Sequence, residues 1–351
     1  MTLTPPPASP PSTEPAPLPG ATPARDTDAA PGPWRRGPVL AVPALLVGLV
    51  MLLHAWIPDV GGLGSLVETF LPWCGAVVAV LLVLALLRRS ATALVALLLP
   101  VTVWLSLFGG LLTDRSGAPG DLTVASHNVG AGNADPAGTA RALAASGADV
   151  LALEELTAEA GGTYEKELAR TYPHHAVRGT VGLWSRLPLS DVRAVDTAMD
   201  AGPLGDAKPE SARMPDNRAL RATVATGRGP LAVYVAHLGS VRVTHRTGFG
   251  TADRNRNAQA LGEALAAERS ERVVLLGDFN GTVDDRALSA LTSRMRSAQE
   301  EAGDGFGFTW PASFPVARID QILVRGVQPS RARVLAGTGS DHLPVAADVS
   351  W

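Results

Sequence analysis

The large hydrophobic residues of the chain gather into three uninterrupted runs near its N-terminus, at residues 39–56, 70–87 and 91–112. Each run is about as long as a helix that crosses a bilayer, and charged residues lie only at its edges. None shows the polar stripe that marks a soluble amphipathic helix. The pattern predicts three transmembrane helices within residues 38–114, because three successive buried core helices of this composition are a weaker explanation.

The arginines that flank these runs predict their orientation, because cytoplasmic flanks are enriched in Lys and Arg. Arginine pairs stand at positions 35–36 and 88–89, whereas the loop around Asp59 and Glu68 has no basic residue. The chain after about residue 114 is therefore expected outside the cytoplasm. A cleavable signal peptide is the alternative for the first run, but no small-residue cleavage pattern follows it. The other two runs would anchor the chain in either case.

The hydrophobic pattern changes on both sides of these runs. Residues 1–37 are rich in Pro, Ala, Thr and Ser and are expected to form a disordered cytoplasmic tail. From Leu122 onward, short apolar or β-branched runs alternate with Ala-rich stretches and with Gly, Asp and Pro turns, which predicts a mixed α/β domain over residues 122–351.

Eight strands and four helices are expected in this domain. The strands are Leu122–Asn128, Val150–Leu153, Val181–Ser185, Ala219–Ala225, Leu231–His237, Val273–Leu276, Ile319–Val324 and Val345–Val349. The helices are Ala137–Ser146, Glu165–Thr171, Arg254–Arg269 and Arg286–Ser293. Two loops rich in Gly, Pro and charge, Asp200–Asn217 and Ser240–Arg254, are expected to influence the choice of substrate.

Charge and cysteine content narrow the function further. The formal net charge is −3, and the segment from Leu122 onward holds 24 Lys and Arg against 26 Asp and Glu. A domain without a basic excess is a poor match for a nucleic-acid binder. The single cysteine, Cys74, lies in the second apolar run, so no intrachain disulfide is possible.

Polar residues with catalytic potential stand where apolar runs give way to turns. They are Asn128, Glu155, His237, Asp278, Asn280, Asp320, Asp341 and His342. Any one of them could be an ordinary turn residue. Collected from several strand ends, however, carboxylates, amides and imidazoles supply oxygen ligands for a hard cation, a base, and donors to phosphoryl oxygens. The set predicts metal-assisted attack on a phosphate.

The motifs around these residues resemble those of the endonuclease/exonuclease/phosphatase superfamily. They are Ser126-His127-Asn128-Val129, the run from Ala148 to Glu155, Gly182-Leu183-Trp184-Ser185-Arg186-Leu187-Pro188, Ala236-His237-Leu238, Gly277-Asp278-Phe279-Asn280, the run from Arg318 to Leu323, and Ser340-Asp341-His342-Leu343-Pro344. The resemblance runs from Leu122 to the C-terminus. It implies an α/β (α+β) fold in which two mixed β-sheets, flanked by helices, form a four-layer DNase I-like sandwich.

The resemblance implies a metal site. Glu155 would hold a divalent cation, usually Mg²⁺ with Mn²⁺ as the alternative, and Asn128 and Asp341 would lie on the same side of the cleft. The chain departs from the family at Glu154, where the common residue is Gln. This extra acid could attract a second cation or face away from the cleft.

The resemblance also implies catalytic roles. Asp278 would activate or position the attacking water, and Asn280 would help to orient the phosphate. His237 and His342 would donate to the phosphoryl oxygens as negative charge builds, and Asp320 would hold His342 in the required tautomer.

Further matches are expected to be structural. Residues 185–188 would end a strand and shape the cleft wall, and residues 308–310 would pack beneath the site. Arg256 and Gln259 resemble an Arg-x-x-Gln pair of the family, although a surface salt bridge explains Arg256 equally well. Four histidines match no motif position and are expected to be ordinary surface or loop residues: His127, His174, His175 and His245.

The leading function is a membrane-anchored, extracytoplasmic, metal-dependent phosphoesterase, and the anchor favours a lipid-linked phosphate or pyrophosphate of the cell envelope. Three spans followed by such a domain resemble the actinobacterial VanJ-type proteins linked to vancomycin and teicoplanin resistance. Two alternatives remain open: an extracellular endonuclease, which the charge balance disfavours, and a catalytically silent binding module, which the complete residue set disfavours.

Overall fold

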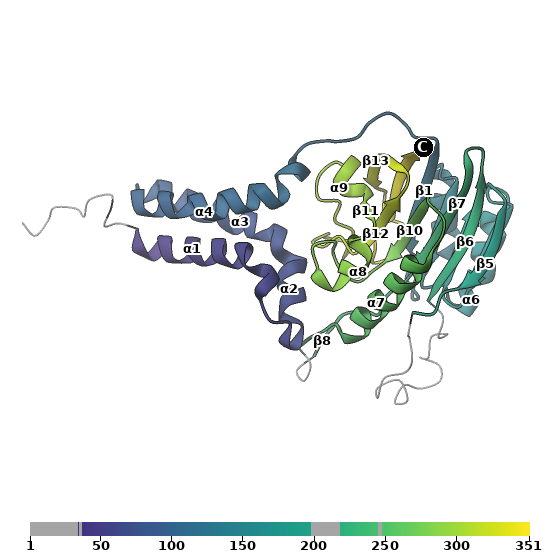
Figure 1. Ribbon diagram of the computed structural model, residues 1–351, viewed down its shortest axis with the longest axis horizontal. Helices are drawn as coiled ribbons and strands as arrows, with labels where there is room; N and C mark the ends of the chain where they lie inside the picture. Colours follow the sequence, from purple (N-terminus) through teal and green to yellow (C-terminus); the bar gives the residue numbers. More distant parts are fainter. Residues whose placement is uncertain (1–33, 35–36, 198–217, 245–247) are drawn as a thin grey trace, which may run out of the picture.

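The computed structural model describes residues 34, 37–197, 218–244 and 248–351. They form a bundle of apolar helices that projects from one end of an α/β domain (Figure 1). The predicted loop Asp200–Asn217 and, apart from Trp34 and Gly37, the predicted disordered tail lie outside the described residues.

The bundle contains four α-helices and four short 3₁₀ turns. The helices are α1 (Pro38–Leu52), α2 (Leu63–Phe70), α3 (Cys74–Leu87) and α4 (Ala91–Phe108), and the turns are η1 (His54–Trp56), η2 (Val60–Gly62), η3 (Leu71–Trp73) and η4 (Gly109–Leu112). Ser90 begins α4 by accepting a hydrogen bond from the N–H of Ala93. The segment around Asp59 and Glu68, which was expected to be a loop, contains the helix α2.

Two continuous helical segments, Val60–Leu87 and Ala91–Leu112, are long and apolar enough to cross a membrane. The second and third predicted spans lie within them. Helix α1 has only 15 residues, so the first predicted span, residues 39–56, is shorter as a helix than its hydrophobic pattern suggests. Only 17% and 22% of the most apolar windows of the two long segments are buried, which is unlike the core helices of a soluble protein.

The α/β domain contains two six-stranded mixed sheets, which confirms the predicted fold. Their strand orders are β13-β14-β1-β2-β4-β3 and β11-β12-β10-β7-β6-β5. The first sheet contains β1 (Leu122–Asn128), β2 (Val150–Glu154), β3 (His174–Arg178), β4 (Val181–Ser185), β13 (Gln328–Val334) and β14 (Val345–Ser350). The second contains β5 (Leu189–Ala194), β6 (Ala219–Thr226), β7 (Gly229–Ala236), β10 (Val273–Asp278), β11 (Arg296–Ser297) and β12 (Asp320–Arg325).

Helices cover the outer faces of both sheets. Helices α5 (Pro136–Ala145) and α6 (Ala158–Leu168) pack on the first sheet, and α7 (Ala252–Ala267) and α8 (Ser289–Thr292) pack on the second, while α9 (Ala298–Ala302) lies near β12 and β13. Between the sheets, fully buried residues such as Val124, Val150, Val233 and Leu276 form one hydrophobic cluster. This central layer fixes the two sheets face to face.

Strand direction brings the polar strand ends together. β1 runs parallel to β2 in one sheet, and β7 runs parallel to β10 in the other. β12 is antiparallel to β10, with Asp320 directly opposite Asp278. Gly277 precedes Asp278 with φ +146°, and a Cβ there would lie 1.8 Å from the carbonyl oxygen of Ala236. Only glycine therefore allows β10 to run so close to β7 at this point.

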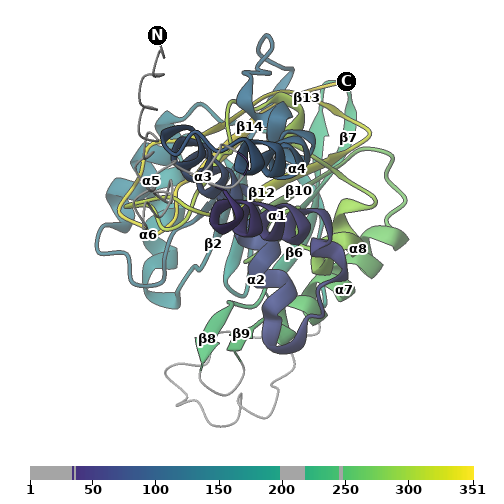
Figure 2. The same cartoon turned by 90° about the vertical axis from the view of Figure 1, so that its left-hand side faces the viewer.

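The eight predicted strands are all present, and the strands that the sequence missed are mostly sheet edges. β3, β5, β11 and β13 each end a sheet, so they have one neighbour and partly exposed side chains that weaken their hydrophobic signal. The predicted loop Ser240–Arg254 contains a small hairpin, β8 (Arg242–Thr244) and β9 (Gly248–Gly250), and the start of α7. This hairpin lies beside α2 (Figure 2).

Candidate active site

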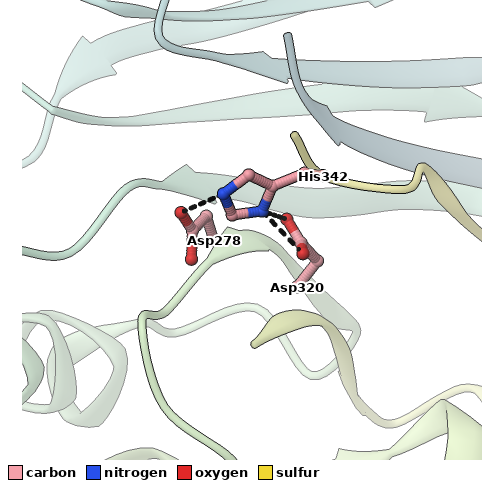
Figure 3. Close-up of side chains that lie close together, drawn as sticks. All are labelled: Asp278, Asp320 and His342. Carbon is pink, nitrogen blue, oxygen red and sulfur yellow. Dashed lines mark hydrogen bonds and ion pairs between the residues drawn. The ribbon is translucent and has the colours of Figure 1, made fainter. Parts of the chain in front are cut away.

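Three of the predicted residues form a compact group of one imidazole between two carboxylates (Figure 3). Nδ1 of His342 lies 2.9 Å from Oδ2 and 3.1 Å from Oδ1 of Asp320. Nε2 of His342 lies 3.8 Å from Oδ2 of Asp278. All three residues are buried, and they arrive from β10, β12 and the loop before β14. The sequence therefore predicted a group that the fold assembles.

The charges in this group depend on one another. Burial alone would lower the pKa of His342, but its hydrogen bond to Asp320, with the charges of Asp320, Asp278 and Asp341, raises that pKa to about 10. Burial and the neighbouring Asp320 raise the pKa of Asp278, and the charges of His342 and His237 oppose this rise. His342 is therefore an imidazolium at neutral pH.

Asn128 joins two carboxylates from opposite sheets. Its Nδ2 donates to Oε1 of Glu155 at 3.1 Å and to Oδ2 of Asp278 at 3.0 Å, while its Oδ1 accepts from the N–H of Gly130 at 3.0 Å. The N–H of Ala131 donates to Oε2 of Glu155 at 2.9 Å. Glu155 adopts φ +58°, a strained conformation for this residue type that turns it out of β2.

Glu155 is an ionised carboxylate that faces the cleft. Burial would raise its pKa, but the charge of His237 and the hydrogen bonds from Ala131 and Asn128 outweigh burial and lower it. Its side chain keeps 24% of its surface exposed, whereas Asp278 keeps 1%. The two acids therefore differ in accessibility and in the direction in which the site shifts their pKa.

His237 follows β7 and lies between these two acids. Its Nε2 is 3.7 Å from Oε1 of Glu155 and 3.7 Å from Oδ2 of Asp278. Burial lowers its pKa, although Asp278 opposes this shift. Neither ring nitrogen has a hydrogen-bond partner among the described residues, and the side chain is only 1% exposed. Buried polar atoms are normally paired, so these nitrogens are available to a bound ligand.

Asn280 orients Asp278. Its N–H donates to Oδ1 of Asp278 at 2.8 Å, and its Nδ2 donates to Oδ2 at 3.2 Å and to the carbonyl oxygen of Leu238 at 3.1 Å. Asn280 has φ +47°, a region that Asn enters more readily than most residues. Its contact with phosphate stays a prediction.

Asp341 lies at the exposed edge of the site, on the side of Glu155. Its Oδ1 is 3.6 Å from the position that a Cβ would take on Gly130, next to the Ala131 that binds Glu155. The neighbouring Ser340 donates to the carbonyl oxygen of Asn128 at 2.8 Å. This bond ties the loop of Asp341 and His342 to the end of β1.

The residues around Glu155 fit a divalent cation. Carboxylate and amide oxygens are the ligands that Mg²⁺ prefers, and the unpaired nitrogens of His237 could donate to water that the cation carries. Asn128 would have to turn its amide, because its nitrogen now faces Glu155. Asp278, Asp320 and His342 also place three ligand-type atoms within 4.8 Å of one another. Nδ1 of His342 already bonds Asp320, and its Nε2 faces Asp278, so this group is suited to proton transfer.

Two residues of the site were not predicted by their position after a strand. Arg218 precedes β6, its carbonyl oxygen accepts from the N–H of His237, and its Nε has no hydrogen-bond partner among the described residues. Burial lowers the pKa of Arg218, and the charge of Glu155 opposes this. Glu154 has no exposed surface, accepts from Oγ of Ser126 at 2.9 Å, and has a pKa that burial raises well above its usual range. With no exposed surface, this carboxyl offers no ligand to a second cation at the cleft surface.

The expectation of a surface or loop position was wrong for one histidine, His127. His127 is fully buried in β1, where Nε2 contacts Oγ1 of Thr338 at 2.7 Å. Burial, aided by the charge of His342, lowers the pKa of His127 to about 3. His174 and His175 lie on the edge strand β3, and His245 lies outside the described residues.

Arg256 and Gln259 of α7, which resemble the Arg-x-x-Gln pair of the family, do not contact the site residues that the structure describes. Arg256 pairs with Asp253 on the exposed helix face, and Gln259 bonds Glu263. Arg254 instead is buried and donates to the carbonyl oxygen of Asn280 at 3.2 Å. The surface salt bridge was therefore the better explanation of Arg256.

The segment at 308–310 supports the site only in part. Oγ1 of Thr309 accepts from the N–H of Asp320 at 3.4 Å, as packing beneath the site requires. Phe308 stacks on Trp73 of the helical bundle, with ring centroids 5.8 Å apart, and Trp310 is 37% exposed. Ser185, at the end of β4, accepts from the N–H of Leu187 and shapes the turn that was predicted there.

The arrangement of these residues agrees with a known protein family. The model of the Endonuclease/Exonuclease/phosphatase family matches residues 125–342, which is more than half of the chain and includes every predicted site residue. The chain belongs to this family. Family members are metal-dependent hydrolases of phosphoric esters, and the chain is an enzyme of this class. A comparison with curated proteins finds no match.

Solved structures of family members share the fold. A Staphylococcus aureus beta toxin variant with bound magnesium ions has 15% identity and a TM-score of 0.52, over 65% of this chain and 99% of that one. D. rerio TDP2 with a single-strand DNA product has 20% identity and a TM-score of 0.51, over 65% and 98%. A mannosyl-6-phosphatase of Bacteroides thetaiotaomicron has 17% identity and a TM-score of 0.50, over 66% and 100%.

Proposed function

We propose that the chain is a membrane-anchored, Mg²⁺-dependent phosphoesterase that works outside the cytoplasm on a phosphate ester or pyrophosphate carried by a lipid of the cell envelope. The observation that carries this proposal is the direct link between the candidate site and the apolar helices. The N–H of Ala312 donates to the carbonyl oxygen of Asp341 at 2.7 Å, and Nε1 of Trp73 donates to the carbonyl oxygen of Val316 at 2.8 Å. One short loop thus touches both the site and the bundle.

The surface of this loop suits a lipid. Between its two contacts it exposes Phe314 to 69%, and Trp310 beside it is 37% exposed. On the bundle side, Trp56 and Val60 are 83% and 80% exposed. Aromatic side chains of this kind are typical of the boundary between water and hydrocarbon. Because this loop bonds Asp341, a phosphate at the membrane surface would meet Phe314 and Trp310 close to the acids.

Membrane insertion explains the exposed leucines and valines of the helical segments. Leu87, Leu98 and Val80 are 76%, 64% and 59% exposed, which is unfavourable in water and favourable in lipid. The turn between α3 and α4 carries Arg88 and Arg89, which favours the cytoplasmic side for this turn and the other side for the hydrolase domain.

In the proposed reaction, Asp278 takes a proton from the attacking water, and the oxygen of this water bonds to phosphorus. The bond from phosphorus to the leaving oxygen breaks, and the leaving oxygen takes up the proton from Asp278. His237 and the imidazolium of His342 donate to the phosphoryl oxygens as their charge grows, and Asp320 maintains that imidazolium. Asn280 holds Asp278 in position. A divalent cation, held by Glu155, Asn128 and Asp341, would supply electrostatic stabilisation of the phosphoryl charge.

The nuclease alternative has less support. The domain carries 24 basic and 26 acidic residues, so it lacks the excess charge that draws a protein to a phosphate backbone. The likeness to a DNA-bound structure is one of fold. A silent binding module would need no acid, amide and imidazole set, whereas this chain has one.

The deciding experiment uses the full chain in lipid nanodiscs. Phosphate release would be measured with Mg²⁺, with Mn²⁺ and with EDTA, from polyprenyl phosphates and pyrophosphates, phospholipids, and single- and double-stranded DNA. We expect metal-dependent turnover of a lipid phosphate that Asp278→Asn abolishes and Arg256→Ala, a surface control on α7, leaves unchanged. Cleavage of DNA alone would replace the proposal with the nuclease, and no turnover would favour the binding module.

Topology needs its own test. A reporter that is active only in the cytoplasm, fused after Trp351, should stay inactive, and a reporter that is active only after export should work. The reverse result would overturn the extracytoplasmic placement without affecting the assignment of the reaction.

A further inference from the structure

Helix α2 buries polar residues and exposes large apolar residues, which is the opposite of an amphipathic helix in a soluble protein. Its buried residues include Ser65, Glu68 and Thr69, while Leu63 and Phe70 are 49% and 37% exposed. A helix of a soluble protein turns its apolar side to the core. Here the polar residues contact the hydrolase domain, where Ser65 bonds Asp285 and Glu68 pairs with Arg286, and α2 lies beside the β8–β9 hairpin (Figure 2). The polar side must therefore have partners in the domain.

Those partners form a buried charge network. Oγ of Ser65 donates to Oδ1 of Asp285 at 3.2 Å and accepts from Nη2 of Arg254 at 2.9 Å. Nη1 of Arg254 lies 2.7 Å from Oδ2 of Asp285, and both side chains have no exposed surface. A buried ion pair is stable only when its remaining donors and acceptors are satisfied, and Ser65 satisfies one group on each partner.

The same network reaches the candidate site. Nη1 of Arg254 also donates to the carbonyl oxygen of Asn280 at 3.2 Å. Asn280, held at φ +47°, donates twice to Asp278, through its N–H and its Nδ2. Three contacts therefore lead from Ser65 on α2, through Arg254 and Asn280, to the proposed base.

A second contact fixes α2 to Arg286, which lies at the end of the segment that follows Asn280. Glu68, with no exposed surface, lies 2.9 Å from Nε of Arg286 and accepts from its N–H at 3.0 Å. Arg286 also donates to the carbonyl oxygens of His54 at 3.1 Å and Ala55 at 2.7 Å. The segment from Asn280 to Arg286, which follows the proposed base, is thus held at its start by Arg254 of α7 and at its end by the helical segment that precedes the domain.

We propose that α2 is a working part of the hydrolase, and that Ser65 is a positioning residue that acts on Asp278 through Arg254 and Asn280. This inference rests on the proposed function. The anchor then does more than tether the domain, because the position of Asp278 depends on the docking of α2. Hydrolysis therefore requires that the domain be packed against its membrane helices. A domain cut free at residue 122 would lack this support.

The test compares variants of the full chain in nanodiscs, with bis(p-nitrophenyl) phosphate as a soluble probe that needs no lipid recognition. Ser65→Ala should lower kcat about tenfold, because small misplacement of a catalytic group is costly, and should leave KM within about twofold. Amide hydrogen exchange should quicken in residues 279–286 and stay unchanged in β1. Ser65→Thr, which keeps the hydroxyl, should restore both kcat and the exchange rates of residues 279–286.

The matched control is Arg115→Ala. Arg115 also connects the helical segment to the domain, through the carbonyl oxygen of Glu300 at 2.8 Å, but it does not touch the network. Equal losses in both variants would mean that general docking matters and Ser65 does not, which would overturn the proposal. Unchanged kcat and exchange in Ser65→Ala would overturn it as well. If the wild-type chain hydrolyses nothing, the proposed function fails, and exchange in residues 279–286 still decides the role of Ser65.

Discussion

Oδ2 of Asp320 lies 2.9 Å from Nδ1 of His342, and this contact sets the charge of the candidate site. The two residues come from separate elements, β12 and the loop before β14, so the fold alone creates the pair. The pKa of His342 is raised from 6.5 to about 10. The pair therefore stabilises the folded state fully below pH 6.5, and this contribution is lost as the pH rises through about 10.

Asp320→Asn should remove the main support of the His342 cation. We expect kcat to fall about a hundredfold at neutral pH, which is within the usual range for a disabled acid–base group. The alkaline limb of the pH–rate profile should also move to lower pH, because the pKa of His342 falls. Rates measured between about pH 6 and 10 would check this, and an unmoved limb in an active variant would contradict it.

Asp278→Asn should separate activity from stability. The carboxylate is buried beside Asp320, and its pKa is raised, so the folded state gains little from its charge. We expect turnover to fall by about 10³-fold or more, because the proposed base is gone, while the thermal midpoint is kept or raised. Activity assays and tryptophan fluorescence melting would be compared. A large fall in the midpoint would show that the loss of activity reflects unfolding.

The sequence was most informative where burial is complete. The bounds of β1 and β4 were predicted correctly; both strands lie inside the first sheet, and almost all of their side chains are buried. β5 was missed because most of its side chains are exposed or partly exposed and only β6 pairs with it. Helix α6 begins at Ala158, earlier than predicted, because Thr157 caps a segment whose paired glycines hide the helix signal.

Site residues that follow strands could be predicted, since each lies where a hydrophobic run ends. Arg254 could not, because its partners Ser65 and Asp285 are far from it in sequence and only the fold brings them together. Glu68 was predicted to lie in an external loop for the same reason. A lone acid in an apolar region gives no sign of a contact with an arginine 218 residues away.

His127 should make the fold sensitive to acid. The folded protein keeps this ring neutral down to about pH 3, whereas the unfolded chain takes up a proton near pH 6.5. Stability present above pH 6.5 should therefore fall by up to about 1.4 kcal/mol per pH unit below it. His127→Gln should flatten this part of the profile. Thermal midpoints between about pH 4 and 7 would show it, and parallel profiles would refute the assignment.

Gly277→Ala should damage the fold at the base of the site. A Cβ there would meet the carbonyl oxygen of Ala236 at 1.8 Å, so β10 would have to move away from β7. We expect a loss of about 3 kcal/mol of stability together with activity. Gly227→Ala is the matched control, because a Cβ on Gly227 would meet no atom of the described residues within 4 Å. Equal melting curves for the two variants would contradict the steric argument.

Arg254→Ala and Arg256→Ala should differ sharply, although the residues are neighbours on α7. The first substitution leaves Asp285 buried without its ion pair, which typically costs about 3–5 kcal/mol. The second removes a surface pair whose arginine is 50% exposed, worth about 0–1 kcal/mol. Arg254→Lys should recover only part of the loss, since one ammonium cannot bond Ser65, Asp285 and Asn280 together as the guanidinium does. Equal thermal midpoints for the two alanine variants would mean that the charge network does not stabilise the fold.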